Sequence, residues 1–144
     1  MAGIDTWTSV RPLPRTARLF PDETTTSFIV RLEKANALRT GQLKSVLRRS
    51  QRPWIETLTA WAEYDPEVLS RAMPQLAQPG ARHVPNPARV GRPNRRIQGL
   101  ACHRCALSRC QAGRIQIYST HERVLCPRHG LWLGDGVTTI EDQL

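Results

Sequence analysis

The sequence has few aromatic residues and no long apolar run. Aromatic residues make up 6% of its 144 residues, so the chain can bury only a modest core. Small domains with thin cores often need a metal ion or disulfides. No stretch approaches the ~18–20 apolar residues of a membrane-spanning helix, and the first residues lack an apolar segment of signal-peptide length. We therefore expect a soluble, cytoplasmic protein with a cross-linked core.

Acidic residues are nearly missing from the middle of the chain. Residues 82–128 hold ten Arg and a single acid, Glu122, which gives this stretch a net charge of +9. Lysine is also scarce, since only Lys34 and Lys44 stand among the 21 basic residues. Such a block fits the phosphates of nucleic acid, which release counterions when they are neutralised. A basic face that only meets solvent has the same composition, so both interpretations stay open.

Common motifs of hydrolytic enzymes are also missing. The sequence contains neither G-x-x-x-x-G-K-[ST] nor G-x-S-x-G. A metal-dependent nuclease would need a general base and further metal ligands, and His121 and Glu122 are the only such pair near the cysteines. We therefore predict a protein that is not an enzyme.

Four short helical patterns occupy the first half of the chain, at residues 24–36, 41–49, 53–62 and 65–73. A threonine of the 24–26 run can cap the first helix, and Asp65 can cap the last. Arg31, Glu33 and Lys34 are expected to point away from the core. The residues expected to face it are Phe28, Ile29, Leu32, Ala35, Leu43, Val46, Leu47, Trp54, Ile55, Leu58, Trp61, Ala62, Val68, Leu69 and Met73.

The first two helices are joined by the short segment "ALRTG" and could form a helix-turn-helix. Its exposed face would then consist of Gln42, Lys44, Ser45, Arg48 and Arg49. The same residues could instead be the solvated surface of a protein-binding bundle.

The second half predicts a different kind of structure. Residues 74–99 contain five Pro, three Gly and five Arg and lack apolar periodicity, which is typical of a linker. Two strand-like runs follow, "RIQIYS" and "RVLCPRHGLWL". We predict an α+β chain with four parts: an extended arm (1–20), a small helical domain (21–79), a basic linker (80–99) and a zinc-ribbon-like module (100–144).

Two ligand pairs define that module. Cys102 and Cys105 are spaced C-x2-C, and Cys126 and His129 are spaced C-x2-H, with 20 residues between the pairs. Two ligands separated by two residues can reach one ion from a tight turn, and four such ligands complete the tetrahedral shell of Zn²⁺. Because no position is left open for water, we predict one structural zinc ion.

Other assignments of these residues were weighed. Cys110, His103 and His121 compete for a ligand position, although His103 is expected to point outward and His121 has no turn spacing to the second pair. Free buried thiols and a disulfide are the alternatives to a metal site.

Three segments together resemble the TniQ family, which includes TnsD-like proteins. They are "RPLPRTARLFPDETTTSFIVRLEKANAL" (11–38), "WIETLTAWAEYDPEVLSRAMPQL" (54–76), and "CHRC" (102–105) followed by "VLCPRHGLWL" (124–133). The order of the segments is that of the family. The chain lacks the further C-x2-C pair that many members have, and His103 stands where a proline often follows the first cysteine, so it would be a short form.

The resemblance implies a role in target selection for DNA transposition. Family members bind target DNA or couple a targeting complex to an AAA+ regulator and a transposase, often as dimers. We therefore expect a DNA-binding adapter of a bacterial transposition system, with a stand-alone helix-turn-helix regulator as the alternative. The candidate DNA contacts, most of them to phosphate, are Arg89, Arg92, Arg95, Arg96, Arg104, Arg109, Arg114 and Arg128.

Overall fold

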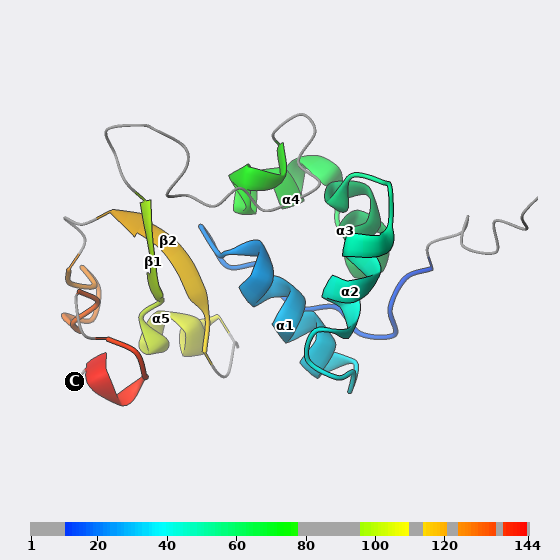
Figure 1. The fold of residues 1–144 in the computed structure, drawn as a ribbon. Helices are drawn as coiled ribbons and strands as arrows, with labels where there is room; N and C mark the ends of the chain where they lie inside the picture. Colours follow the sequence, from blue (N-terminus) through cyan, green and yellow to red (C-terminus); the bar gives the residue numbers. More distant parts are fainter. Residues whose placement is uncertain (1–10, 78–95, 110–113, 121–123, 135–136, 144) are drawn as a thin grey trace, which may run out of the picture.

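The chain is mostly helical and has one small antiparallel sheet, which confirms the coarse fold class. The computed structural model describes residues 11–77, 96–109, 114–120, 124–134 and 137–143. In chain order, the elements are α1 (Thr25–Ala35), α2 (Gln42–Arg49), α3 (Trp54–Ala62), α4 (Pro66–Ala72), η1 (Pro74–Ala77), β1 (Arg96–Leu100), α5 (His103–Ser108), β2 (Gln116–Thr120) and η3 (Glu141–Gln143). The helices α1 to α4 gather on one side of the molecule, and the sheet and α5 on the other (Figure 1). Among the described residues, no helix has the length and apolar character to cross a bilayer.

The helix starts follow from their capping residues. The Oγ1 atom of Thr24 accepts a hydrogen bond from the Ser27 N–H at 3.1 Å, as predicted for the threonine run. A carboxylate oxygen of Asp65 accepts from the Glu67 N–H at 2.8 Å, and Pro66 takes the first helical position. The four helical patterns therefore end up as four helices within a few residues of their predicted bounds.

The helical core contains most of the expected residues, but Ala35 and Ile55 are only half-buried, and two more are exposed. Val46 is 43% exposed and Val68 is 45% exposed, so neither lies on the buried stripe where the periodicity placed it. The short helices α2 and α4 bury only part of one face, chiefly through Leu43, Leu47 and Leu69. The buried cluster consists of Ala17, Phe28, Ile29, Leu32, Leu43, Leu47, Trp54, Leu58, Trp61, Ala62, Leu69, Met73 and Leu76.

Glu33 is buried, contrary to the prediction, because it caps a neighbouring helix. Its carboxylate accepts hydrogen bonds from the backbone N–H of Gly41 at 2.9 Å and of Leu43 at 3.0 Å. These two donors lie at the start of α2, which has no capping side chain of its own. The chain reaches α2 through Gly41, whose φ of 90° suits glycine. Glu33 thereby fixes the turn between α1 and α2.

The sheet pairs two segments of the second half. Strands β1 and β2 run antiparallel, with Gly99 opposite Ile117 and Leu100 opposite Gln116. The sequence did not predict β1, because residues 96–99 lie in the stretch that its composition assigned to a linker. The second strand-like run, "RVLCPRHGLWL", forms only an isolated bridge between Leu125 and Trp132. Residues 78–95 lie outside the described part, and the predicted division into domains stays a prediction.

The start of the helical half lies against β2. The Thr24 N–H donates to the Gln116 carbonyl at 2.9 Å, and the Tyr118 N–H donates to the Asp22 carbonyl at 2.8 Å. The Gln116 N–H in turn donates to the Ser27 hydroxyl at 3.0 Å. This segment therefore forms an isolated antiparallel bridge to β2, with Glu23 opposite Ile117, immediately before α1.

Residues of the arm predicted for 1–20 also join the two halves, so far as positions 11–20 show. The Leu13 N–H donates to the Trp61 carbonyl at 2.9 Å, and Ala17 belongs to the helical core. Phe20 instead packs in a second buried cluster, with Ala101, Ala106, Ile115 and Ile117. Residues 11–20 thus pack against both halves.

A buried ion pair lies at this junction. The guanidinium of Arg31 makes two hydrogen bonds of 2.8 Å to the two carboxylate oxygens of Glu23, and both side chains are buried. The same guanidinium also donates to the Arg18 carbonyl, and the Ser27 hydroxyl donates to Glu23 at 2.9 Å. Arg31 was predicted to point away from the core. It is buried instead, because Glu23 supplies the partner that makes its burial possible.

We predict that Arg31→Met destabilises the protein by about 3–5 kcal/mol, since it leaves a buried carboxylate without its oppositely charged partner. Burial raises the pKa of Glu23, and the hydrogen bonds from Arg31 oppose that rise. Without Arg31 the pKa of Glu23 rises further, so the loss should shrink as the pH falls and the carboxyl takes up a proton. Urea unfolding at several pH values measures this. Glu23→Gln in the same chain should restore part of the stability, and Arg39→Met, at an exposed position, should change it little.

Candidate metal centre

The first ligand pair lies at the start of α5. Cys102 is the cap residue of this helix, and Cys105 lies within its first turn. Residues three apart at a helix start lie on the same side, so the two sulfurs can approach one point. Cys102 is buried, and Cys105 is half-buried. The predicted tight turn is therefore a helix start, which provides the same convergence.

The second pair lies in a closed turn. The Gly130 N–H donates to the Cys126 carbonyl at 2.8 Å, and the Cys126 N–H donates to the Leu131 carbonyl at 2.9 Å. Gly130 has a φ of 64°, in the left-handed region that a side chain disfavours. The turn brings His129 back over Cys126, and Gly130 makes the sharp exit predicted for it.

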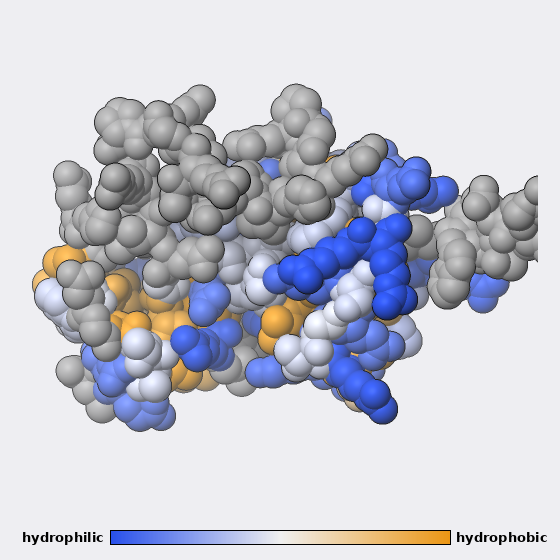
Figure 2. Space-filling model, viewed as in Figure 1, coloured by the Kyte–Doolittle hydropathy of each residue, from blue (hydrophilic) through white to orange (hydrophobic). Residues whose placement is uncertain are grey.

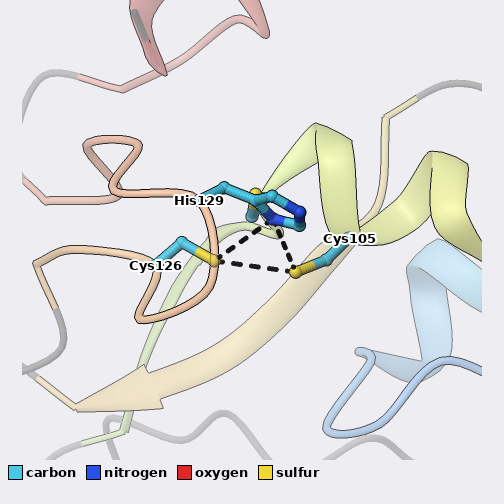
Figure 3. Close-up of side chains that lie close together, drawn as sticks. Cys105, Cys126 and His129 are labelled. Carbon is cyan, nitrogen blue, oxygen red and sulfur yellow. Dashed lines mark hydrogen bonds between the residues drawn. The ribbon is translucent and has the colours of Figure 1, made fainter.

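The four predicted ligands converge. The ligand atoms of Cys102, Cys105, Cys126 and His129 all lie within 4.8 Å of one another. The Nδ1 atom of His129 lies 3.5, 3.3 and 3.7 Å from the sulfurs of Cys102, Cys105 and Cys126, respectively. Figure 3 shows the ring of His129 next to the sulfurs of Cys105 and Cys126, which are 3.6 Å apart. The two turns therefore present three sulfurs and one nitrogen to a common centre.

These distances fit a single tetrahedral ion. Bonds of ~2.3 Å to sulfur and ~2.0 Å to nitrogen would separate ligand atoms by ~3.5–3.8 Å. The measured separations of 3.3–3.7 Å between sulfur and nitrogen, and of 3.6 Å between the sulfurs of Cys105 and Cys126, lie close to this range. A disulfide would need ~2.05 Å between sulfurs, and Cys102, Cys105 and Cys126 are free. The group can hold a metal ion with the protein supplying all four ligands.

The protonation of the thiols is strongly uneven. Burial raises the pKa of Cys105 to about 11, and the sulfurs of Cys126 and Cys102 add to this rise. Burial also acts to raise the pKa of Cys126, but the backbone N–H groups of Arg128 and His129 and the neighbouring sulfurs lower it to about 6. At neutral pH the metal-free cluster therefore favours a thiolate at Cys126 and a protonated thiol at Cys105. This is expected because a negative charge on one sulfur disfavours a second negative charge on its neighbour.

The competing ligands do not join the cluster within the described residues. His103 is half-buried, and its Nδ1 atom lies 3.2 Å from the Oε1 atom of Gln143, so its ring does not point outward as predicted. Cys110 and His121 lie outside the described residues. The sequence does not point to Gln143, because a lone glutamine has no spacing or pattern that links it to the cysteines.

The predicted DNA contacts have different positions. Arg104, Arg109, Arg114 and Arg128 are exposed, and Arg104 and Arg128 stand between the two ligands of the first and second pair, respectively. The guanidinium of Arg109 lies over the ring of Phe20, 5.5 Å from its centroid, which gives this residue a packing role as well. Arg96 begins β1, and Arg89, Arg92 and Arg95 lie outside the described residues.

Comparisons with models of protein families, with curated proteins and with solved structures gave no match.

We predict that Cys126→Ser abolishes metal binding and unfolds the second half of the chain, because ligand capture and folding are coupled in small metal modules. Metal content by mass spectrometry and unfolding by circular dichroism measure the two effects. Cys110→Ser is the matched control and should keep one ion per chain. A Cys126→Ser protein with the metal content and melting curve of the original chain would contradict the ligand assignment.

Metal binding should also release protons. At neutral pH the metal-free Cys105 thiol carries a proton, since its pKa is about 11, and a bound ion must displace that proton. The affinity should therefore fall at least about tenfold for each unit by which the pH decreases. It should fall more steeply below about pH 6, where Cys126 also takes up a proton. Competition with a chelator of known pH dependence measures this slope, and a flat profile between about pH 5 and 8 would argue against thiolate ligands.

Proposed function

We propose that this chain is a non-enzymatic DNA-binding adapter, stabilised by one structural zinc ion, and that it serves DNA transposition. The observation that carries the proposal is the convergence of three sulfurs and one imidazole nitrogen within 4.8 Å, among exposed arginines. Zinc is the ion proposed because it favours tetrahedral sites made of thiolate and imidazole. Four protein ligands leave no position for a reacting water, which supports a structural role.

The charge around the cluster supports nucleic acid as the partner. The described residues between 96 and 134 include five arginines and no acid. Four of them, Arg104, Arg109, Arg114 and Arg128, are exposed and come from both sides of the cluster in the sequence. Scattered guanidinium groups of this kind suit phosphates best, because a phosphate can be bound without contacts to specific bases.

The proposed link to transposition rests on the order of the sequence segments that resemble the TniQ family. Contacts in the structure are compatible with an adapter, since the helical half and the metal module are joined by backbone hydrogen bonds and by the bond from the Gln116 N–H to the Ser27 hydroxyl. In this proposal the basic surface holds DNA. An AAA+ regulator, a transposase or a targeting complex would bind the remaining faces, and a homodimer is compatible with the proposal.

A second candidate function is a stand-alone DNA-binding regulator that uses α2. Residues 34–55 contain six basic side chains and no acid. Five of the six are exposed: Lys34, Arg39, Arg48, Arg49 and Arg52. Figure 2 shows hydrophilic side chains, drawn blue, gathered over α2. Glu33 fixes the turn before this helix. These features favour a helix presented to the major groove, as in a helix-turn-helix.

Binding to duplex DNA at increasing salt tests the proposal. We predict that the affinity falls steeply as the salt concentration rises. In a plot of the logarithm of the affinity against the logarithm of the salt concentration, the steepness of the slope should decrease by about 0.9 for each phosphate contact that is removed. Replacement of Arg104, Arg114 and Arg128 by Gln should lower the slope by up to about 2.7 if all three contact phosphate. Arg109 is left in place because it packs on Phe20.

The matched comparison replaces Lys44, Arg48 and Arg49 by Gln. A loss confined to this variant, together with a footprint at one short inverted repeat, would favour the regulator over the adapter. Affinity that does not depend on salt, or that survives both sets of substitutions, would contradict DNA binding through either surface.

A further inference from the structure

Gln143 is a fully buried polar residue that contacts the surroundings of both ligand pairs. Its side chain is 0% exposed. The Nε2 group donates to the Ala101 carbonyl at 2.8 Å, and the Oε1 atom accepts from the His103 N–H at 3.0 Å. These two partners directly flank Cys102 in the sequence. The backbone carbonyl of Gln143 accepts from the Trp132 N–H at 3.2 Å, three residues after His129.

The contact with His103 supplies a cap that α5 otherwise lacks. A helix leaves its first N–H groups without intrahelical partners, and the cap residue usually accepts from one of them through its side chain. Here the cap residue is Cys102, which makes no capping hydrogen bond and whose sulfur faces the other ligands. Gln143, 40 residues away, accepts the first N–H instead. The same Oε1 atom lies 3.2 Å from Nδ1 of His103, and two donors around this oxygen fix the orientation of the amide.

A closed turn presents Gln143 to the cluster. One carboxylate oxygen of Asp142 accepts hydrogen bonds from the N–H of Thr138 at 2.9 Å, the hydroxyl of Thr138 at 3.1 Å and the N–H of Thr139 at 2.8 Å. The Gln143 N–H donates to the Ile140 carbonyl at 3.2 Å. The side chain of Gln143 is therefore delivered by an ordered segment.

We propose that Gln143 is a positioning residue of the metal centre, which holds the two ligand-bearing turns at tetrahedral spacing and slows the loss of the ion. This inference rests on the proposed metal site. It follows from the three contacts together, because one residue ties the start of α5 to the strand-like segment that follows His129. Residues that orient metal ligands without touching the ion commonly change metal affinity 10–100-fold when they are replaced.

Release of Co²⁺ from the full chain to an excess of chelator tests the proposal. Gln143→Met keeps the length of the side chain and removes both amide contacts, so release should be about 10–100-fold faster. Asp142→Ala loosens only the turn that presents Gln143, and release should be faster by a smaller factor. Glu141→Gln, an exposed neighbour, is the matched control and should release the ion at the original rate.

The cobalt absorption spectrum separates positioning from general damage. A loaded Gln143→Met protein should keep circular dichroism like that of the original chain, while its ligand-field bands shift or broaden as the turns relax. Unchanged spectra and an unchanged release rate in this variant would overturn the proposal. A shifted spectrum with rapid release would support the proposal, whether or not the protein binds DNA. If neither the original chain nor any variant bound metal, the metal site itself would be overturned.

A measurement on the unmodified chain covers the case in which Gln143→Met does not fold. If Gln143 stabilises the loaded centre, metal must in turn stabilise the docking of Gln143, because coupling between two binding events is reciprocal. In the metal-loaded chain, hydrogen exchange at the N–H groups of His103 and Trp132, which both bond to Gln143, should therefore be as slow as at those of Cys126 and Gly130, which bond within a ligand-bearing turn. Much faster exchange at His103 and Trp132 than at Cys126 and Gly130 would contradict the proposal.

Discussion

The convergence of Cys102, Cys105, Cys126 and His129 is the constraint on which the second half of the molecule depends. Five buried apolar residues form the cluster around Phe20, and the sulfurs themselves supply most of another buried cluster. So small an apolar core buries too little surface to order a module of this kind alone, and a metal ion is the usual additional constraint.

The two halves of the chain are less separate than a linker between them would imply. Residues 22–24 bond to β2 immediately before α1, and Ser27 in the first turn of α1 accepts from the Gln116 N–H, so the first helix begins on the sheet of the metal module. The Glu23–Arg31 pair lies buried at this junction, where one charge without the other would be strongly unfavourable. The two halves are therefore joined by a short connection that is hydrogen-bonded to β2.

Sequence reasoning found the elements that local patterns specify and missed those that depend on distant partners. The four helices have apolar periodicity and capping residues, and the four ligands have turn spacing, so both could be predicted. Strand β1 could not, because "RIQGL" acquires strand structure only by pairing with β2. Arg31 and Glu33 were placed outside because charged residues usually are, and their burial depends on Glu23 and on the start of α2, respectively. Gln143 has no local signature, since its role comes from residues about 40 positions away.

The central claim is that one closed-shell ion holds the two ligand-bearing turns together. Elemental analysis of the chain, purified without added metal and without chelators, tests it most directly. The account predicts one zinc ion per chain, whose removal by a chelator melts the second half and leaves the helical half with most of its ellipticity. Freshly purified, folded protein that contains no stoichiometric metal, and that does not change on addition of zinc, would contradict it.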